Sequence, residues 1–228
     1  MDIPLQENKT QSKSASYRVI APGRVPLVEP GDDLARIILA ALTEAGETLA
    51  DGDVLVLAQK IVSKSEGRYR KLHEVTPSAR ALELGAEVEK DPRLVELILS
   101  ESTGVAGSRK GVLVVAHRLG LVLANAGIDS SNVEHGVGID GLRVLLLPKD
   151  PDASCRALCA ELLARTGRKV AVIINDSLGR AWRNGTVGAA IGAAGITALM
   201  DLNGRPDLFD RPLQATHVAL ADELAAAA

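Results

Sequence analysis

Residues 170–177 read Val170-Ala171-Val172-Ile173-Ile174-Asn175-Asp176-Ser177, five apolar residues followed by an amide, a carboxylate and a hydroxyl. An unbroken apolar run of this length predicts a strand that is buried on both faces. Asp176 comes straight after the run. The sequence therefore predicts a carboxylate held rigidly at the end of a buried strand.

A second segment has the same design. Residues 125–132 read Asn-Ala-Gly-Ile-Asp-Ser-Ser-Asn and place Asp129 after the apolar run at 119–124. Carboxylates with neighbouring Ser or Asn oxygens are typical ligands of Mg²⁺ or Mn²⁺, and glycine lets the backbone approach a bulky anion. The alternative is that both aspartates cap helices or turns, which Asp and Ser favour whatever the function. Two such segments favour a metal and phosphate site.

The rest of the chain mixes helical and strand patterns without clean βαβ alternation. A hairpin is expected around 118–120, and the strand at 54–58 leads toward Lys64. The expected class is α+β, or mixed α/β, with a mixed, largely antiparallel sheet and flanking helices. Helices are predicted at 32–45, twice between 77 and 102 with a break near Asp91-Pro92, from Asp152 or Ser154 to about 166, and at 216–228; the further strands at 112–116, 119–124 and 143–147.

The composition excludes some classes of function. The 228 residues are 46% apolar, enough for one large or two small domains with a normal core. A net charge of -3, from 26 basic and 29 acidic residues, leaves no clustered positive surface for nucleic acid. Only 2% of residues are aromatic, so stacking platforms for single strands are missing too. Nucleic acid is not an expected partner.

The N-terminal sequence predicts a cytoplasmic protein. Residues 1–16 are polar and indicate a disordered arm before a single domain at 17–228. No basic start with an apolar stretch indicates a signal peptide, and no window approaches the ~20 apolar residues of a membrane helix. Cys155 and Cys159 lie four apart in an expected helix, and both are expected to be reduced.

Several other features leave alternatives open. The small-residue segment at 185–195 either lets the backbone approach a substrate or packs tightly against a neighbouring element. Trp182 lies either at a pocket rim or against another element. The four histidines show no zinc-ligand spacing, and His135 in the glycine-containing loop 134–141 is the one of most interest. No dinucleotide fingerprint or phosphate loop is present, which argues against a Rossmann or P-loop protein.

The motifs N-A-G-I-D-x-S-N at 125–132 and D-S-x-G-R-x-x-R-x-G at 176–185 resemble the signature segments of the coenzyme F-420:L-glutamate ligases, or gamma-glutamyl ligases. The similarity runs from about residue 19 to the last residue. It implies the gamma-glutamyl ligase-like fold and an intertwined, butterfly-like homodimer with sites near the interface. Further matching segments lie at 26–28, 31–34, 51–56, 62–68, 91–95 and 150–154.

The resemblance also implies a reaction. GTP transfers its γ-phosphoryl group to the lactyl carboxylate of the F-420 precursor, F-420-0, and the amine of L-glutamate attacks the acyl phosphate. GDP and phosphate leave, and later glutamates join through γ-carboxylates. Mg²⁺ or Mn²⁺, two per site in the fullest form, is the implied cofactor, with K⁺ as a further candidate. Phosphoryl transfer needs mainly charge neutralisation and positioning, which divalent ions provide.

Residue by residue, the resemblance assigns Asp129 and Asp176 as catalytic metal ligands and Ser177 as a third ligand where many relatives have Thr. Lys64 would meet phosphate, although a solvated surface lysine is the alternative. Arg180 and Arg183 either grip an anionic substrate bidentately or form structural ion pairs. The nucleotide-binding candidates are Arg24, Val25, Pro26, Leu27, Ala58, Gln59, Lys64 and Asn132.

Two departures from the family pattern leave other functions open. Asn175 stands where relatives usually carry Ser or Thr. The C-terminal end of the family domain, a glycine-rich loop with a metal ligand and nucleotide contacts, is expected to be missing after Ala228. The alternatives to the ligase are a non-catalytic nucleotide- or deazaflavin-binding homologue and an amide ligase for another carboxylate acceptor.

Overall fold

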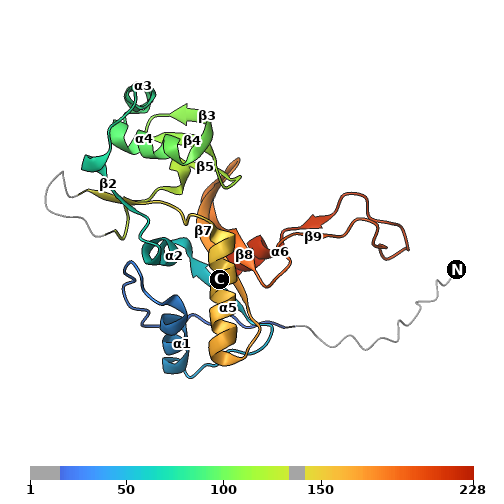
Figure 1. Ribbon diagram of the computed structural model, residues 1–228. Helices are drawn as coiled ribbons and strands as arrows, with labels where there is room; N and C mark the ends of the chain where they lie inside the picture. The colour runs from blue at the N-terminus through green and yellow to red at the C-terminus, as the bar shows by residue number, and fades with distance from the viewer. Residues whose placement is uncertain (1–15, 134–141) are drawn as a thin grey trace, which may run out of the picture.

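The computed structural model describes residues 16–133 and 142–228. It confirms the mixed α+β class, with short, mostly antiparallel sheets and flanking helices (Figure 1). The predicted arm at 1–16 lies outside the described residues except for its last position, and the loop 134–141 with His135 lies outside them as well. The described chain forms two lobes, one above the other in Figure 1.

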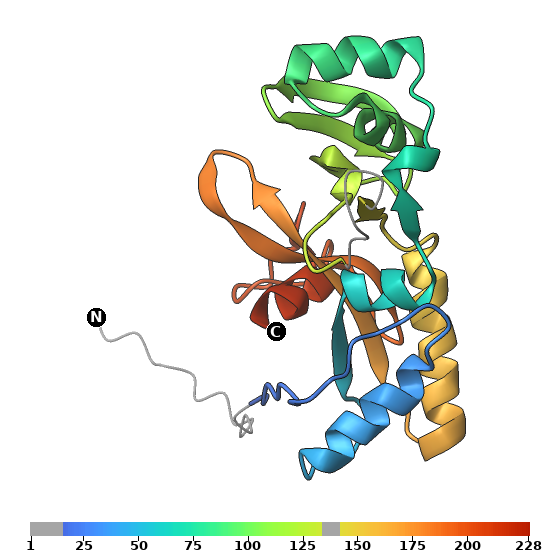
Figure 2. The same ribbon diagram turned by 90° about the vertical axis from the view of Figure 1, so that its left-hand side faces the viewer.

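The lower lobe is built on a three-stranded sheet of order β1-β7-β8, comprising β1 (Val54–Ala58), β7 (Ala171–Arg180) and β8 (Arg183–Ala194). β1 is parallel to β7, and β7 is antiparallel to β8. Helices α1 (Leu34–Glu44) and α5 (Pro151–Thr166) cover one face, and α6 (Leu220–Ala227) covers the other (Figures 1 and 2). Burial on both faces explains the unbroken apolar run that begins β7.

Successive β7 side chains enter different cores. Val172 and Ile174 pack with Cys155, Leu158 and Leu162 of α5. Ile173, which points to the opposite face, packs with alanines of α6. This alternation is the ordinary period of a strand.

The upper lobe packs α3 (Ala79–Val88) and α4 (Pro92–Ser100) on a second sheet of β3 (Ser102–Arg109), β4 (Val112–His117) and β5 (Val122–Ala124). Asp91 accepts a hydrogen bond from the Arg93 main-chain N–H at 2.9 Å, and Pro92 occupies the first turn, which confirms the predicted break. The predicted hairpin is confirmed as β4-β5. β3 was missed because its Ser- and Gly-rich sequence is exposed at nearly every position and shows no apolar alternation.

Short elements connect the lobes. β2 (Tyr69–Lys71) pairs antiparallel with β6 (Arg143–Leu145), and the turn η1 (Leu72–Glu74) follows β2. Helix α2 (Gln59–Ser65) begins directly after β1. β9 (Met200–Asp201) and β10 (His217–Val218) pair at the base of an arm that extends from the lower lobe (Figure 1).

Several predicted boundaries were wrong, including those of β7, α5 and α6. The strand predicted at 170–174 continues as β7 to Arg180. The reason is that β8 pairs with β7 along that length, and the antiparallel main-chain hydrogen bonds keep its polar second half extended. Asp176 therefore lies inside the strand rather than after it. α5 begins at Pro151, capped by Asp150, and α6 begins at Leu220 instead of 216 because β10 precedes it.

The small-residue segment packs against the chain's own backbone. At three of its glycines an added Cβ would lie under 3 Å from a main-chain or proline atom. Real Cβ contacts are not that short, so these positions favour tight packing over approach to a substrate. They are Gly188 against α6 at 2.6 Å, Gly192 against the start of α5 at 2.5 Å and Gly195 against Val170 at 2.7 Å.

Both cysteines are free thiols, as predicted. Burial raises the pKa of Cys155 to about 12, so its thiol is unreactive at neutral pH. None of the described helices has the length and apolar character needed to cross a membrane.

A partly buried polar network joins β4 to the segment between the lobes. Arg68 and Arg118 donate to the Glu101 carboxylate at 3.1 and 3.0 Å. The buried His117 accepts a hydrogen bond on Nδ1 from the Leu119 main-chain N–H at 3.0 Å. Burial lowers the pKa of His117, and the charge of Arg118 lowers it further against the opposing effect of Glu101. The folded protein therefore holds this imidazole neutral.

Acidification should destabilise the protein through His117. The unfolded histidine binds a proton near its ordinary pKa of 6.5, whereas the folded one resists protonation, so the free energy of unfolding falls as pH drops below that value. His117→Gln, which keeps a hydrogen-bond acceptor, should flatten the dependence of melting temperature on pH between about 7 and 5. Thermal unfolding at several pH values measures this. His217→Gln, at an exposed histidine, should keep the wild-type slope, and an unchanged slope in His117→Gln would contradict the prediction.

Candidate functional site

Asp129 is positioned by a strained turn. Before it, the turn η2 (Asn125–Gly127) places Asn125, Ala126 and Gly127 at φ of +51°, +54° and +64°. Left-handed backbone at a buried alanine costs about 1 kcal/mol or more and persists only where packing enforces it. A Cβ on Gly127 would meet Leu147 at 2.9 Å, so glycine is required there. The tight turn directs the following segment out of the upper lobe.

The main chain of Asp129 is then anchored to β6. Its N–H donates to the Leu145 carbonyl at 3.1 Å, and its carbonyl accepts from the Leu145 N–H at 2.8 Å. These paired bonds form an isolated antiparallel bridge. They hold the carboxylate-bearing residue in an extended conformation between the lobes.

The Asp129 carboxylate faces a lysine and a serine. Lys60 Nζ lies 2.6 Å from its Oδ2, and the Ser131 main-chain N–H donates to its Oδ1 at 2.7 Å. The Ser131 hydroxyl adds a bond at 3.0 Å. Burial raises the pKa of Asp129, but the hydrogen bonds from Lys60 and Ser131 outweigh it and hold the pKa below its ordinary value. The group is an anion at neutral pH.

Asp176 lies half-buried within β7, opposite Ala189 of β8. Burial raises the pKa of Asp176, the main-chain N–H of Ser177 lowers it, the Asp129 carboxylate raises it and Lys60 lowers it. Asn175, next to Asp176, pairs with Ala58, and Lys60, two residues after Ala58, reaches Asp129 at 2.6 Å. The two aspartates, 47 positions apart in sequence, therefore contribute to one electrostatic site together with Lys60.

Helix α2 forms the third side of this site. Ala58, at the end of β1, is the register partner of Asn175, next to Asp176. Lys64 Nζ donates to the Asn132 carbonyl at 2.8 Å. Gln59 is buried and accepts a hydrogen bond from Ser63. Figure 2 shows the segment after η2 descending from the upper lobe to α2. Ala58, Lys64 and Asn132 thus lie around the aspartates, whereas the Gln59 side chain is used internally.

Ser177 and Asn175 flank Asp176 on the strand. Adjacent strand residues point to opposite faces, so neither side chain is directed to the same face as the Asp176 carboxylate. The Asn175 Oδ1 is buried with no hydrogen-bond partner in the described chain and lies 2.9 Å from where a Gly188 Cβ would be. Ser177 is exposed, and its role as a ligand stays a prediction.

These oxygen donors suit a hard divalent cation that binds protein carboxylates on one side and a phosphate group on the other. Within residues 16–133 and 142–228, no three His, Cys, Asp or Glu side chains come together as a potential metal-binding group. Mg²⁺ is usually held by one or two carboxylates and completes its shell with water and substrate phosphates. Asp129 and Asp176 meet that requirement.

The stretch Arg24, Val25, Pro26 and Leu27 lies elsewhere in this chain. Arg24 forms an ion pair with Glu44 at 2.7 Å. Arg24, Pro26 and Leu27 line a depression of about 470 Å³ against α1, and all of the described residues that line it come from 24–44. Within a single chain, residues 24–27 and the two aspartates therefore do not line the same pocket.

Arg180 and Arg183 lie at the turn of the β7-β8 hairpin. They are register partners, both exposed, and Arg180 donates to the Asn184 carbonyl. The Trp182 side chain between them is fully exposed, so of the two alternatives for Trp182, packing against another element of the described chain does not hold. The arginines can meet an anion only at the outer end of the hairpin.

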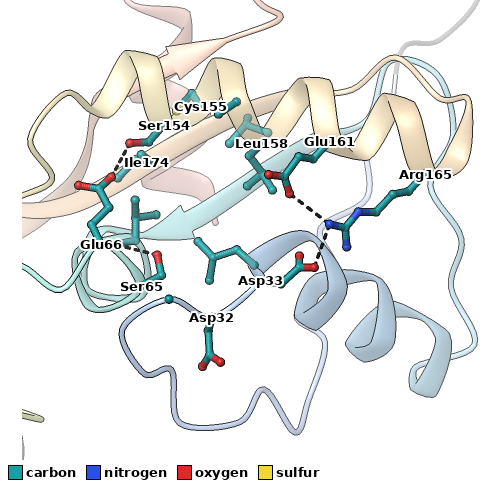
Figure 3. A pocket seen from close by; sticks show the side chains of 15 residues that line it. Asp32, Asp33, Ser65, Glu66, Ser154, Cys155, Leu158, Glu161, Arg165 and Ile174 are labelled. Atoms are coloured by element: carbon teal, nitrogen blue, oxygen red, sulfur yellow. Dashed lines mark hydrogen bonds and ion pairs between the residues drawn. The ribbon is translucent and has the colours of Figure 1, made fainter.

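A pocket of about 440 Å³ between α1, α2 and α5 is unsuited to a triphosphate (Figure 3). Four carboxylates and a single guanidinium line it. Arg165 pairs with Asp33 at 2.8 Å and Glu161 at 3.4 Å, and Glu66 accepts from the Ser154 hydroxyl at 2.5 Å. These contacts link the helices to one another, and the acidic lining would repel phosphate.

Lys60 is the site residue that sequence reasoning missed. It lies four residues before Lys64, and an i, i+4 pair shares one face of a helix. The signal was present in the sequence, but the apolar run before it suggested only a strand that led toward Lys64. With α2 unrecognised, there was no reason to place both lysines together.

Comparisons with known proteins identify the family of the chain. The family model described as F420-0:Gamma-glutamyl ligase matches residues 23–228. The coenzyme F420:L-glutamate ligase of Methanothermobacter thermautotrophicus is 48% identical over 204 residues, which cover 90% of this chain and 79% of the relative. The ligase of Archaeoglobus fulgidus is 44% identical over 202 residues, covering 89% and 76%. That of Methanopyrus kandleri is 45% identical over 207 residues, covering 90% and 78%.

Proposed function

The chain belongs to the F420-0:gamma-glutamyl ligase family, and on that premise we propose that it joins L-glutamate to the coenzyme F-420 precursor F-420-0 at the expense of GTP and with a divalent metal ion. The lactyl carboxylate receives the γ-phosphoryl group, and the glutamate amine displaces phosphate from the acyl phosphate. GDP and phosphate are the other products. The proposal extends to further glutamates joined through γ-carboxylates.

The convergence of Asp129 and Asp176 on the start of α2 supports this proposal best. The Asp129 carboxylate lies 2.6 Å from Lys60 Nζ, and Asp176 follows Asn175, which pairs with Ala58 directly before the same helix. Bound Mg²⁺ or Mn²⁺ would neutralise the phosphate oxygens during transfer. Asp129 and Asp176 would hold the ion, with Ser177 as a further candidate ligand and K⁺ as a candidate second cation.

Lys64 and Asn132 would position the nucleotide. Lys64 offers a compact charge to phosphate from the same helix face as Lys60. Ala58 and Gln59 lie where β1 meets α2, close to the strand that carries Asp176. Arg180 and Arg183, exposed at the hairpin turn, would meet the carboxylates of an anionic substrate.

A homodimer would complete this site. Residues 24–27 lie against α1 and not around the aspartates of the same chain, so their assigned contact with GTP fits a nucleotide held between two copies. Sedimentation or light scattering measures the assembly. A monomer that is fully active would contradict this part of the proposal.

The ligase activity can be tested directly. The protein is incubated with GTP, L-glutamate, F-420-0 and either Mg²⁺ or Mn²⁺, and the products are separated and weighed by mass spectrometry. We expect a mass gain of one or more glutamyl units, with one GDP and one phosphate released per unit. Reactions without GTP or without metal are the controls.

The negative outcomes have distinct meanings. No product with either ion would overturn the proposal. Nucleotide binding without turnover would favour a non-catalytic homologue. Glutamate-dependent GTP consumption with another carboxylate, but not with F-420-0, would favour an amide ligase for a different acceptor.

A further inference from the structure

The Lys60 ammonium lies where a metal cation bound to Asp129 could lie. Its Nζ lies 2.6 Å from Asp129 Oδ2 and 2.7 Å from Ser131 Oγ. Mg²⁺ sits about 2.0–2.1 Å from its oxygen ligands, so an ion on Asp129 Oδ2 and this ammonium would occupy overlapping space. An ammonium nitrogen here is therefore close to where a metal ion on Asp129 would be.

The surroundings limit how Lys60 can be arranged. Its side chain is 26% exposed and that of Asp129 is 37% exposed, so both charges are only partly solvated. Asp176, the second carboxylate, also feels the charge of Lys60. The ammonium thus balances the Asp129 carboxylate when no other cation is bound.

The second lysine of α2 makes a different contact. Lys64 donates to the Asn132 main-chain carbonyl at 2.8 Å and, within the described chain, forms no hydrogen bond or ion pair with either aspartate. The two lysines therefore hold the segment 129–132 at different points. Of the two lysines of α2, Lys60 is the one that contacts an aspartate carboxylate.

We propose that Lys60 is a tethered cation that competes with the divalent ion for Asp129, so that metal binding displaces its ammonium toward the phosphate-binding side. The inference rests on the proposed function because it concerns the same metal site. In the free protein, Lys60 would keep the paired carboxylates from repelling each other and would weaken binding of the first ion. After displacement, its charge would be available to a phosphate.

Metal binding without nucleotide tests this competition. Mn²⁺ is titrated into the full chain, and the free ion is followed by electron paramagnetic resonance. Lys60→Met keeps the apolar stem and removes the charge, so Mn²⁺ should bind roughly five- to fiftyfold more tightly than to the wild type, since a partly exposed ion pair and a like charge beside the metal are both removed. Lys60→Arg, which retains a cation, should not gain affinity.

Matched variants separate the local effect from net charge and folding. Lys110→Met breaks another lysine–carboxylate pair, 2.8 Å from Glu89 in the upper lobe, and should leave Mn²⁺ affinity within about twofold. The double variant Asp129→Asn/Lys60→Met should lose the gain. Lys60→Gln provides a second uncharged substitution, and circular dichroism checks that each variant is folded.

The results can distinguish this inference from the proposed function. If the wild type binds Mn²⁺ through Asp129 and catalyses ligation but Lys60→Met binds no more tightly, the tethered-cation inference is wrong and the ligase proposal stands. A gain that survives Asp129→Asn would also overturn the inference. If neither wild type nor Lys60→Met shows Mn²⁺ binding that depends on Asp129, both proposals fail.

Discussion

Replacing Asp176 by asparagine should lower the rate of glutamyl transfer by about a thousandfold or more while the chain stays folded. Metal ions supply several kcal/mol of charge stabilisation in such transfers, and each 1.4 kcal/mol is about tenfold in rate. Asn is nearly the same size but carries no charge to hold the ion. The measurement is turnover of F-420-0 at saturating GTP, combined with Mn²⁺ binding.

Stability should not fall in the same variant. Burial raises the pKa of Asp176, which means that the folded state is penalised for carrying this charge at neutral pH. The penalty appears as pH rises above the unfolded value of 3.8 and is fully present once pH exceeds the folded pKa. Asparagine removes it, so the melting temperature at neutral pH should stay equal or rise. A large loss of stability would show that Asp176 serves the fold instead.

Asp222→Asn is the matched control. Asp222 of α6 accepts a hydrogen bond from the Ala190 main-chain N–H at 2.8 Å, and Ala190 pairs with Asn175, next to Asp176. Asp222→Asn therefore makes the same chemical change at a carboxylate that contacts the neighbouring strand β8 and has a structural role. It should keep most of the activity. Equal losses in both variants, or near-normal activity in Asp176→Asn, would remove Asp176 from the proposed mechanism.

Gly192→Val should strongly destabilise the protein through a purely steric clash. A Cβ at Gly192 would lie 2.5 Å from Pro151 Cβ and 2.6 Å from its carbonyl carbon. Pro151 begins α5 and cannot rotate away, and Asp152 fixes the same contact by accepting the Ala193 N–H at 2.9 Å. Overpacking of this kind costs about 1–3 kcal/mol or more. Thermal unfolding should show a fall of about 2–4 °C per kcal/mol in a chain of this size.

The cause of that loss can be isolated, because Gly192 does not have a left-handed φ. Any side chain can adopt its backbone conformation, so the effect is steric. Gly179→Ala, on the neighbouring strand β7 with open space around it, should change stability by less than about 1 kcal/mol. If Gly192→Val unfolds at the wild-type temperature, the packing interpretation of these glycines is wrong.

Local patterns predicted most of the elements because each depends on neighbours in sequence. The apolar run before Asp176 reports burial on both faces, and Asp91-Pro92 reports a helix start. β3 and α2 escaped because one is exposed and glycine-containing and the other is a seven-residue helix directly after a strand. The polar half of β7 escaped because its pairing with β8, and not its own composition, keeps it extended.

The candidate site residues could be named from the chain itself, since two aspartates among small and amide residues predict a metal and phosphate site. Their proximity was not readable, because it depends on a strained turn at 125–127, a main-chain bridge from Asp129 to Leu145 and pairing of β1 with β7. The contact between Lys60 and Asp129 also depends on long-range packing, because a charge on a helix acts strongly only on groups that packing brings within a few ångströms of it. Sequence patterns record the preference of each residue for its surroundings, whereas long-range contacts decide which residues share them.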